Sequence, residues 1–373
     1  MSSPSVDKPK HRQIFEHVHA AIVAGQYQAG QRVPSEAALG RRFDASRPTV
    51  ARAMRDLEIA GYVERRVGSG TYVLVPQEVG NKMFGLLIPG LGSTEIFEPL
   101  CAEIARLMQA QNFTLLWGDS SPGAVDDANH VAQALCEQYV AQRVAGVFFA
   151  PIELTPGMDE TNRQIASALD RAGIPVVLLD RDLEQFPRRS HFDLVGIDNR
   201  RVGYMLVEHL VGLGRRRIDF VARPGSAPTV DSRIAGWREA LTCHGIQPDA
   251  TWLHRGDPSD LEFVRELIGS APQAFLCAND FTAANLMQNL IRLGGRVPQD
   301  VGVVGVDDVK YASLLSVPLT TVRQPCREMG MAAVAAMIQR IENRSLGARD
   351  ILLDCKLVVR ESCGAALADP GSA

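Results

Sequence analysis

The chain has 373 residues, of which 46% are hydrophobic and 22% charged, so it is long enough for two or three domains and has the balance of a globular protein. Neither its first segment, MSSPSVDKPKHRQ, nor any later stretch has the apolar run of a signal peptide or a membrane helix, and we expect a cytoplasmic protein with no membrane partner. Residues 1–75 carry a formal charge of +4 (11 Lys and Arg, 7 Asp and Glu), which leaves −8 on the rest of a chain of net charge −4. This division indicates that only the N-terminal part meets nucleic acid.

The cysteines exclude two kinds of site. There are seven of them, an odd number, and no two have CxxC spacing. The sequence therefore predicts neither a disulfide framework nor a structural zinc site, and no metal is expected. We interpret the cysteines as reduced packing residues. They are Cys101, Cys136, Cys243, Cys277, Cys326, Cys355 and Cys363.

Two helices are expected in the first 45 residues. In PKHRQIFEHVHAAIVAG, the residues Ile14, Val18 and Ile22 lie at helical spacing and form one apolar face. Ser35 is a suitable N-cap for a short second helix that runs to about Phe43. Such short amphipathic helices need a further element to cover them.

A third helix is expected to begin after Ser46, and its apolar positions at helical spacing are Val50, Ala53, Met54 and Leu57. Pro48, Arg52 and Arg55 then point outward, and Arg47 lies in the first turn, where helix-turn-helix proteins present base-reading residues to DNA. The following YVERRVGSGTYV predicts a basic hairpin with a glycine-containing tip. Arginines on a helix are often only a solvated face, but three short helices and a basic hairpin together favour DNA binding.

The segment GQRVPSEAALGRRFDASRPTVARAMRDLEIAGYVERRVGSGTYV closely resembles the winged helix-turn-helix domain of GntR-type transcription regulators, through PSE, S-R-x-T-V, L-E-x-x-G-Y and G-x-G-T. The resemblance implies that residues of the second helix, the third helix and the wing contact DNA. These are Ser35, Glu36, Arg47, Pro48, Thr49, Arg52, Ser69 and Gly70. Among them, Glu36 is expected to support an arginine rather than to touch anionic DNA. Ala37 and Ala51 stand where many relatives carry an arginine that reads a guanine or a phosphate.

After a linker over residues 76–82, short apolar runs alternate with helical segments. The runs are MFGLLI, FTLLW, AGVFF, PVVLL, DLVGI, RIDFV, QAFLC and VGVVGV. Continuous apolar strands that alternate with helices predict parallel sheets covered on both faces. Eight such strands fit two α/β lobes in residues 83–363, and residues 364–373 are expected to be a disordered tail.

Polar residues follow several of these strands. VVLL runs into Asp180 and Arg181, AFLCA into Asn279, and VVGV into Asp307. Because ligands of open parallel sheets bind beyond the carboxyl ends of the strands, we expect these side chains to converge on one site. Carboxylate, guanidinium and amide groups together suit the vicinal hydroxyls of a sugar. The alternative, that such residues only form turns, is kept for the aspartates that directly follow Asn279 and Asp307.

Residues 83–363 resemble the effector domain of the LacI/GalR regulators, which is similar to periplasmic sugar-binding proteins, through IPVVLLDRD, DSRIAGWREAL, CANDFTAANLMQNLIRLGG and PLTTVRQPCREMG. The resemblance implies sugar contacts by Phe97, Asp180, Arg181, Arg233, Asn279, Asp307 and Gln324. Arg233 and Asp307 are the strongest candidates, because two charges inside a cleft would be costly without each other or a polar ligand. Trp237 is assigned to packing.

The same resemblance implies that the chain crosses three times between the lobes and forms a hinge there. The crossings are expected near His191, Val322 and Arg349. Lobe 1 then covers about residues 83–190 and 325–348, and lobe 2 about residues 192–322 and 350–363.

Other classes of protein fit the sequence less well. GLLIPGLGSTE contains Gly90-x-Gly92, but Glu95 replaces the third glycine of a dinucleotide fingerprint and would oppose a pyrophosphate, so an NAD-dependent enzyme is a remote alternative. The chain has no P-loop, GxSxG or HExxH motif, and we expect no enzyme and no cofactor. A transport protein would have no use for a DNA-binding head.

The sequence therefore predicts an α/β protein with an N-terminal winged helix-turn-helix domain, residues 1–75, and a two-lobed, periplasmic-binding-protein-like domain with parallel sheets. We expect a transcription regulator, most simply a repressor, that binds a palindromic double-stranded DNA operator as a homodimer and is released by a monosaccharide. A pentose such as arabinose is the first candidate. The alternative on the same fold is a sensor of a nucleoside or a sugar phosphate.

Overall fold

The computed structural model divides into two compact units, which we call the head (residues 1–81) and the body (residues 82–373). It describes residues 9–23, 26–28, 30–59, 62–66, 69–73, 82–88, 96–118 and 127–365. Most of the expected linker, the Gly90-x-Gly92 segment and most of the expected tail lie outside these residues. Within the described ranges, no helix combines the length and the apolar character needed to cross a membrane.

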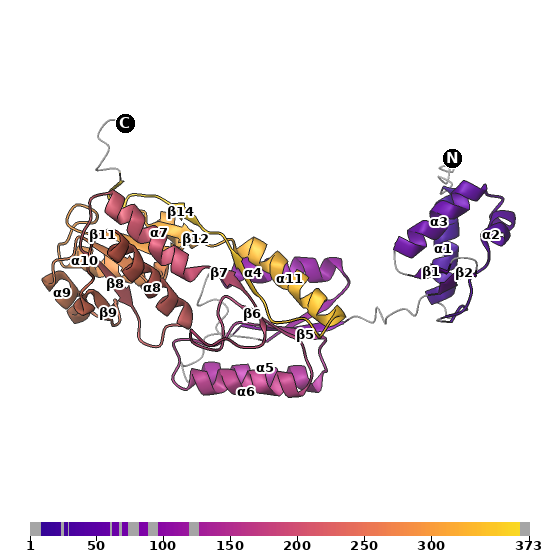
Figure 1. The fold of residues 1–373 in the computed structure, drawn as a ribbon, viewed down its shortest axis with the longest axis horizontal. Helices are drawn as coiled ribbons and strands as arrows, with labels where there is room; N and C mark the ends of the chain where they lie inside the picture. The colour runs from indigo at the N-terminus through magenta and orange to yellow at the C-terminus, as the bar shows by residue number, and fades with distance from the viewer. Residues whose placement is uncertain are drawn as a thin grey trace, which may run out of the picture. The chain divides into compact units, whose positions relative to one another are not determined.

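The head contains three helices and a two-stranded hairpin (Figure 1). Its elements are α1 (Lys10–Val23), α2 (Glu36–Phe43), α3 (Arg47–Ile59), β1 (Val63–Arg66) and β2 (Gly70–Val73). β1 and β2 pair antiparallel, and the segment before α2 adds to the free edge of β2 through a hydrogen bond of 3.0 Å from Val33 N to Thr71 O. The hairpin is thereby tied to the helices.

One apolar core holds these head elements together, and it contains the residues that helical spacing predicted. The buried members are Ile14, Val18, Ile22, Val33, Leu39, Val50, Ala53, Met54, Leu57, Val63 and Val73. Ser35 caps α2 as expected, because its Oγ accepts a hydrogen bond of 3.2 Å from Ala38 N. The predicted helices and hairpin of the head are confirmed.

The first lobe of the body is a six-stranded, all-parallel sheet in the order β13-β7-β6-β5-β3-β4. Helices α4 and α11 cover one face and α5 and α6 the other (Figure 1). Its elements are β3 (Met83–Leu87), α4 (Phe97–Ala110), β4 (Thr114–Trp117), α5 (Asp127–Ala141), β5 (Gly146–Phe149), α6 (Met158–Arg171), β6 (Val176–Leu179), β7 (Asp193–Ile197), α11 (Cys326–Glu342) and β13 (Asp350–Leu353).

The second lobe is a six-stranded sheet in the order β14-β12-β11-β10-β8-β9, parallel except for β14. Its elements are α7 (Asn199–Gly212), β8 (Ile218–Ala222), α8 (Pro228–Cys243), η1 (Ala250–Trp252), β9 (Leu253–Arg255), α9 (Leu261–Gly269), β10 (Ala274–Cys277), α10 (Asp280–Arg292), β11 (Gly302–Asp307), η2 (Lys310–Ser313), β12 (Thr320–Arg323) and β14 (Lys356–Val358).

The apolar runs of the sequence are strands whose two faces are both covered. In β8, Phe220 belongs to the core on the side of α7 and α8, whereas Val221 belongs to the core on the side of α9 and α10. All eight strands expected in the body are present. The sequence pattern missed four further strands, β9, β12, β13 and β14, and three of these are short strands at sheet edges with little buried apolar surface.

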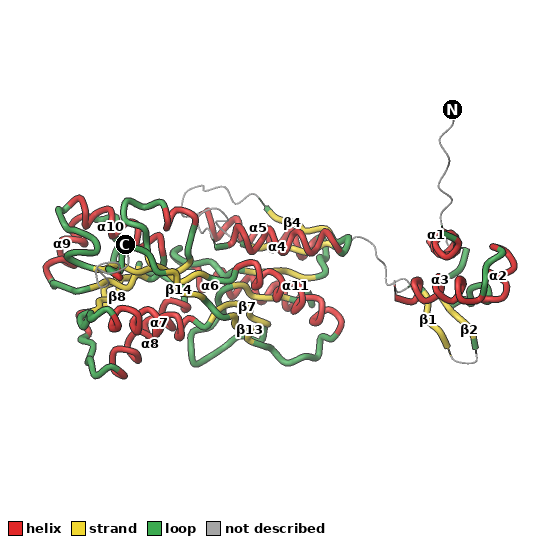
Figure 2. Tube along the Cα trace, turned by 90° about the horizontal axis from the view of Figure 1, so that it is seen from above, coloured by secondary structure: helices red, strands yellow, loops and turns green. Residues whose placement is uncertain are grey.

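Two of the three expected crossings between the lobes are displaced along the chain. β7 pairs with β6 and β13 pairs with β7, so both strands belong to lobe 1 (Figure 2). The chain therefore crosses after Ile197 rather than near His191, and after Leu353 rather than near Arg349, while the crossing after Arg323 lies near Val322 as expected. An apolar strand such as DLVGI fits either sheet, and hydrophobicity alone does not say which sheet it joins.

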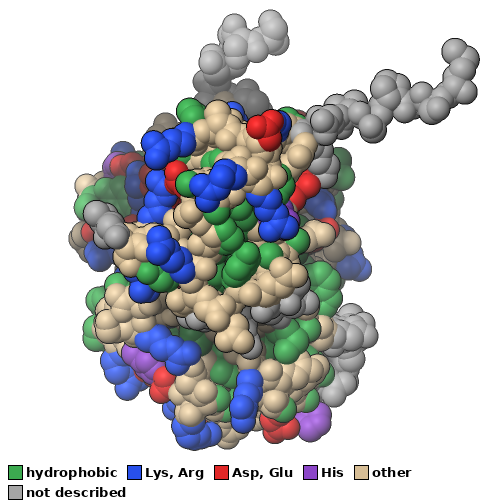
Figure 3. All heavy atoms as spheres, turned by 90° about the vertical axis from the view of Figure 1, so that its right-hand side faces the viewer, with side chains coloured by type: hydrophobic (Ala, Val, Ile, Leu, Met, Phe, Trp, Pro, Cys, Tyr) green, Lys and Arg blue, Asp and Glu red, His purple; other side chains and the backbone are tan. Residues whose placement is uncertain are grey.

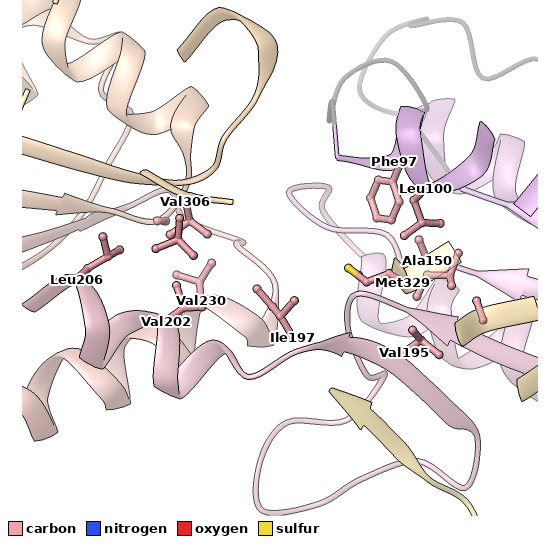
Figure 4. Packing of buried hydrophobic residues seen from close by; sticks show 14 of the residues in the cluster. Phe97, Leu100, Ala150, Val195, Ile197, Val202, Leu206, Val230, Val306 and Met329 are labelled. Carbon is pink, nitrogen blue, oxygen red and sulfur yellow. The ribbon is translucent and has the colours of Figure 1, made fainter. Parts of the chain in front are cut away.

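The two lobes share one apolar core. A single cluster of buried residues contains Phe148 of lobe 1 and Phe220 of lobe 2. In Figure 4, Ile197 lies at the first crossing, between the side chains of lobe 1 and those of lobe 2. Packing at the hinge is therefore continuous with the packing inside each lobe.

Helices α7 and α8 approach each other through two glycines. A Cβ at Gly203 would lie 2.1 Å from the carbonyl oxygen of Arg233, and a Cβ at Gly236 would lie 1.8 Å from that of Arg200. Both distances are far below a van der Waals contact, so only glycine fits without moving a helix. The position of Arg233 in lobe 2 depends on this close approach.

We predict that Gly203→Ala lowers the free energy of unfolding of the body by roughly 1 to 3 kcal/mol, because the new methyl group forces the two helix backbones apart. Thermal and urea unfolding of the purified protein measure the loss. The matched control is Gly212→Ala in the last turn of the same helix, where no atom lies within 4 Å of the new Cβ. That change should leave stability the same or raise it slightly, and equal stability of both variants would contradict the prediction.

Candidate functional site

The outer face of α3 presents a group of exposed residues in the head. Arg47, Pro48 and Arg52 are exposed, because the opposite face of the helix is buried in the head core. Thr49 is half-buried, and its Oγ1 is hydrogen-bonded to Ser46 Oγ at 2.8 Å. The first turn of α3 thus carries an arginine and a fixed hydroxyl pair toward solvent, a pattern that suits contact with a base edge and a phosphate.

Glu36 lies in the first turn of α2 and forms an ion pair with Arg65 of β1. This contact agrees with the expectation that Glu36 supports an arginine. It also attaches the hairpin to α2, so that the two elements move together. Arg65 was absent from the predicted set, although the charge run VERR in the hairpin was the available signal.

The wing is held by polar contacts at its tip. Ser69 Oγ and Tyr72 Oη are hydrogen-bonded at 2.6 Å, and the guanidinium carbon of Arg66 lies 4.7 Å from the centre of the Tyr72 ring. Gly70 has φ +123°, a backbone conformation that favours glycine, and the Arg32 guanidinium lies close to its Cα. Arg32 and Arg66 therefore join Ser69 and Gly70 at this tip.

The head has more cations than anions, with 11 Lys and Arg against 7 Asp and Glu in residues 1–75. Figure 3 shows Lys and Arg side chains spread over the face of the molecule that is turned to the viewer, with Asp and Glu side chains among them. Such a distribution gives a salt-dependent attraction to a polyanion. The residues expected to contact DNA lie on three parts of one small domain: the start of α2, the start of α3 and the wing.

A second set of predicted residues gathers between the two lobes of the body, and we call it the interlobe site. It contains Phe97 at the start of α4, Asp180 and Arg181 after β6, Arg233 on α8, Asn279 after β10, Asp307 at the end of β11 and Gln324 on the second crossing. Asp180, Arg181 and Arg233 are each 5% exposed and Gln324 is 4% exposed. Asp180 and Asp307 have φ angles of 68° and 122°, a conformation that costs energy for a residue with a side chain.

Arg181 has three close neighbours, and its Nε lies 3.7 Å from Asp180 Oδ2, within ion-pair distance but beyond a hydrogen bond. It forms an ion pair with Glu153, and its guanidinium carbon lies 5.6 Å from the centre of the Phe97 ring. Phe97 itself is 1% exposed, so its ring packs in the core and against Arg181. Arg181 Nε is buried without a hydrogen-bond partner among the described residues.

Two further buried atoms of the interlobe site also lack partners among the residues that the structure describes. They are Asp180 Oδ1 and Gln324 Oε1. Buried polar atoms in folded proteins are nearly always hydrogen-bonded, because an unpaired one costs about 1 to 3 kcal/mol. One donor and two acceptors that share one site are therefore evidence for a polar ligand.

No hydrogen bond or ion pair joins Arg233 and Asp307, although the Arg233 charge lowers the pKa of Asp307. Arg233 Nε donates to Asn199 Oδ1 at 2.8 Å, and its Nη1 donates to the carbonyl oxygen of Ala278 at 2.6 Å. Neighbouring polar groups satisfy the arginine instead, since α8 holds it alongside α7 and the end of β10. Asn279 has a structural task as well, because its side chain caps α10 through Thr282 N at 2.9 Å.

Asp307 is the most perturbed acid of the interlobe site. Burial raises its pKa to about 7, against the opposing effects of the Arg233 charge and of a hydrogen bond of 2.7 Å from Gln324 Nε2. The negative charges of Asp180 and Glu153 raise this pKa further. The site therefore holds a carboxyl group that loses its proton near neutral pH.

Glu153 is a member of the site that the sequence reasoning missed. Burial alone would raise its pKa, but the charge and the hydrogen bond of Arg181 outweigh burial, so the pKa lies below the ordinary value. Glu153 follows β5, and inspection of that strand end for polar residues could have found it. Glu153 lies four residues beyond the apolar run, so it was not recognised as a residue of the strand end.

Asp280 and Asp308, for which a turn-forming role was kept open, form hydrogen bonds and ion pairs within lobe 2. Asp280 accepts from Thr321 Oγ1 at 2.6 Å and from Val309 N at 3.1 Å. Asp308 pairs with Arg323 at 2.5 Å and with Arg360 at 2.6 Å. Their carboxylates tie the ends of strands to one another.

A cavity of about 570 Å³ opens beside the interlobe site at the second and third crossings. Asp307 and Gln324 line it, and Glu98, Lys310, Arg327 and Asp354 lie at its charged wall. Asp180, Arg181 and Arg233 are not part of its lining. The cavity therefore adjoins the interlobe site at Asp307 and Gln324.

The interlobe site brings together hydrogen-bond donors and acceptors of both charge signs. Among the described residues, no group of three His, Cys, Asp or Glu side chains could hold a metal ion. The charges are nearly balanced, with Arg181 and Arg233 against Glu153, Asp180 and the titrating Asp307. Donors and acceptors of this kind suit a neutral molecule rich in hydroxyl groups.

Models of known families match both units. Residues 10–73 match the model of bacterial regulatory proteins of the gntR family, and residues 207–363 match that of a periplasmic binding protein-like domain. A relative from Geobacillus stearothermophilus, "Arabinose metabolism transcriptional repressor", is 29% identical over 95% of this chain and 97% of its own length. "HTH-type transcriptional regulator CelR" from Thermobifida fusca is 28% identical over 85% of this chain and 89% of its own.

Solved structures share the fold. The "transcriptional regulator CelR-cellobiose complex" has a TM-score of 0.64 at 24% identity, over 85% of this chain and 91% of that one. The Lac repressor dimer bound to operator has a TM-score of 0.62 at 24% identity, over 76% of this chain and 95% of that one. The α/β architecture with an N-terminal helix-turn-helix domain is therefore confirmed.

We predict that Asp307→Asn raises the stability of the ligand-free protein above pH 7 by roughly 1 to 2 kcal/mol, because asparagine keeps an acceptor for Gln324 but removes the buried charge. Since the pKa of Asp307 is raised to about 7, the folded protein holds a proton that the unfolded chain has lost between about pH 4 and pH 7. The free energy of unfolding of the unsubstituted protein therefore falls as pH rises through this range.

Melting temperatures of both proteins from pH 5 to pH 8 test this prediction. The advantage of Asp307→Asn should be small at pH 5 and largest at pH 8. Asp300→Asn, at an exposed carboxylate paired with Arg296, is the control that should not gain stability with pH. A difference between Asp307→Asn and the unsubstituted protein that does not change with pH would refute the raised pKa.

Proposed function

We propose that this chain is a sugar-responsive transcriptional repressor that joins a GntR-type winged helix-turn-helix head to a periplasmic-binding-protein-like body of the LacI type. Its relatives are regulators and not enzymes. In the proposal, two heads of a homodimer bind a palindromic operator in the cytoplasm, and a small sugar bound at the interlobe site releases them.

The observation that carries the effector proposal is the set of unpartnered buried atoms. Asp180 Oδ1 and Gln324 Oε1 accept, and Arg181 Nε donates. A sugar hydroxyl both donates and accepts, so two or three neighbouring hydroxyls satisfy this set together. The long alignment with an arabinose-metabolism repressor makes a pentose the first candidate.

The alternative effectors fit the site less well. A nucleoside or sugar phosphate would bring negative charge to a site in which Glu153 and Asp180 already oppose Arg181 and Arg233. A nucleobase also needs a ring or an open apolar slot, but Phe97 is buried against Arg181. The charge balance therefore favours a neutral sugar.

Exposed apolar side chains support the homodimer. Trp117 is 59% exposed on β4, the edge strand of the lobe 1 sheet. In lobe 2, Phe281 and Ile291 of α10 are 51% and 41% exposed, and Leu314 is 81% exposed. Large exposed apolar residues at a sheet edge and on a helix are typical of protein interfaces. One small head offers few contacts, and pairing doubles the DNA surface that is bound.

A thermal-shift screen tests the effector class. We expect one neutral pentose or hexose to raise the melting temperature, because a ligand that binds only the folded state stabilises it. Arg233→Ala should lose this shift while it still binds the operator, because the site loses a cation held by Asn199. The control is Arg238→Ala on the same helix, whose guanidinium lies over the outer side of Trp237. A shift with phosphorylated sugars alone would overturn the proposed effector.

We predict that Arg47→Ala lowers operator affinity by at least tenfold and removes the preference for operator over unrelated DNA, because its side chain is exposed at the start of α3. Fluorescence anisotropy with operator and scrambled duplexes measures both quantities. Arg12→Ala on α1, a partner of Glu16, removes the same charge elsewhere in the head. Equal losses in the two variants would mean that Arg47 contributes only net charge.

A further inference from the structure

Contacts between described residues bridge lobe 1 and lobe 2 outside the hinge crossings, and three of them are hydrogen bonds or ion pairs. Leu154 N donates to the carbonyl oxygen of Gly225 at 2.9 Å, and Ala227 N donates to Glu153 Oε2 at 3.2 Å. The third, between Lys310 Nζ and Glu98 Oε2 at 2.8 Å, joins two exposed side chains. Glu153 and Leu154 thus form a two-residue contact with the loop that precedes α8.

Lobe 1 holds this contact segment rigidly. Asn162 of α6, which is 5% exposed, donates to the carbonyl oxygen of Ile152 at 3.0 Å and accepts from Ile152 N at 2.8 Å. These paired hydrogen bonds fix the backbone directly before Glu153. The carboxylate is therefore positioned by the sheet and helices of lobe 1 and not by a loose loop.

One oxygen of Glu153 faces the interlobe site and the other faces lobe 2. Oε1 pairs with Arg181, whose Nε lacks a hydrogen-bond partner among the described residues. Oε2 accepts from Ala227 N, the residue before α8, where no side chain of α8 caps the helix. Because a carboxylate is favoured at a helix N-terminus, the contact is a charge-assisted hydrogen bond.

Arg181 and Arg233 are connected through this carboxylate. Arg181 follows β6 in lobe 1, and Arg233 lies on α8, the helix whose first residue follows Ala227. If the lobes separate, the bond from Glu153 to Ala227 must break, whereas the pair with Arg181 lies within lobe 1 and can persist. The bond therefore belongs to the closed arrangement of the body.

We propose that Glu153 is a positioning residue that couples the interlobe site to closure of the lobes. A ligand hydroxyl bound to Arg181 Nε orients the guanidinium group of Arg181. The guanidinium group in turn holds the carboxylate of Glu153. This carboxylate binds the start of α8, the helix that carries Arg233, and so brings Arg233 into place. This inference rests on the proposed function for its ligand, but the clamp between Glu153 and α8 exists without the ligand. The effect of Glu153 on closure is therefore measurable separately.

Hydrogen exchange on the full-length protein is the test. In Glu153→Ala we expect the amides of Leu154 and Ala227 to exchange about tenfold faster than in the unsubstituted protein, because the closed arrangement loses a charge-assisted hydrogen bond. Glu153→Gln keeps an acceptor for Ala227 N but loses the charge, so the exchange rate of both amides should lie between those of the unsubstituted protein and Glu153→Ala. Glu160→Gln, at an exposed pair with Arg163 on α6, is the control that should leave both amides unchanged.

A second measurement separates closure from binding. With the sugar found in the screen, Glu153→Ala should bind about tenfold more weakly, and small-angle scattering should show a smaller decrease in radius of gyration at saturating sugar. A variant that binds weakly but still compacts fully would make Glu153 a simple binding residue and overturn the coupling.

The remaining outcomes are also decisive. Equal exchange of both amides in the unsubstituted protein, Glu153→Ala and Glu153→Gln would overturn the clamp, whatever the ligand. A third outcome is that both amides exchange faster in the variants while no sugar slows their exchange in the unsubstituted protein. This outcome would support the contact between Glu153 and α8 but reject the proposed sugar ligand. Ala227→Pro removes the donor and leaves the Glu153 carboxylate in place, at a φ of −59° that suits proline, and should also speed the exchange of Leu154.

Discussion

Two guanidinium groups and three carboxyl groups lie close together between the lobes of the body, and their mutual balance is the constraint on which the interlobe site depends. Burying a charge is costly unless a partner or a hydrogen bond compensates for it. Arg181 has Glu153, Arg233 has the side chain of Asn199, and Asp307 responds to burial with a pKa of about 7. The charged and polar groups of this balance come from the strand ends, from α8 and from the hinge. The recognition chemistry of the site therefore depends on how these elements are packed together.

The cost of this arrangement explains why the surrounding structure is so closely packed. Gly203 and Gly236 let α7 and α8 touch backbone to backbone, which fixes the residue that carries the Arg233 side chain. One apolar core runs from Phe148 of lobe 1 to Phe220 of lobe 2, so the two lobes share a common interior at the hinge. Rigid lobes that meet at a few crossings can rotate as bodies, and small changes at the site then become large changes at a distance.

Much of the architecture was accessible from sequence because it rests on periodicity and on strand ends. Helical spacing predicted the head core around Val50 and Leu57, and apolar runs predicted the eight central strands. Which sheet a strand joins was not accessible, because DLVGI fits either one, and two crossings were therefore misplaced. Glu153 was missed because it lies four residues beyond the apolar run that predicts β5, and its contact with Ala227 of lobe 2 joins residues far apart in the sequence. The sequence left open whether Arg233 and Asp307 compensate each other or need a polar ligand, because the hydrogen-bond partners of Arg233, Asn199 and Ala278, are distant in sequence.

The interleaved order of the lobes has a consequence for synthesis of the chain. The sheet of lobe 1 is completed by β13, and one of its faces is covered by α11, yet both elements follow all of β8 to β12 in the sequence. On the ribosome, the head can fold as soon as it emerges, whereas lobe 1 must wait until almost the whole chain has been made. Closing so long a loop is slow, and the incomplete sheet exposes β7 as an edge in the meantime. A prematurely terminated product would therefore contain a complete head on an unfinished body.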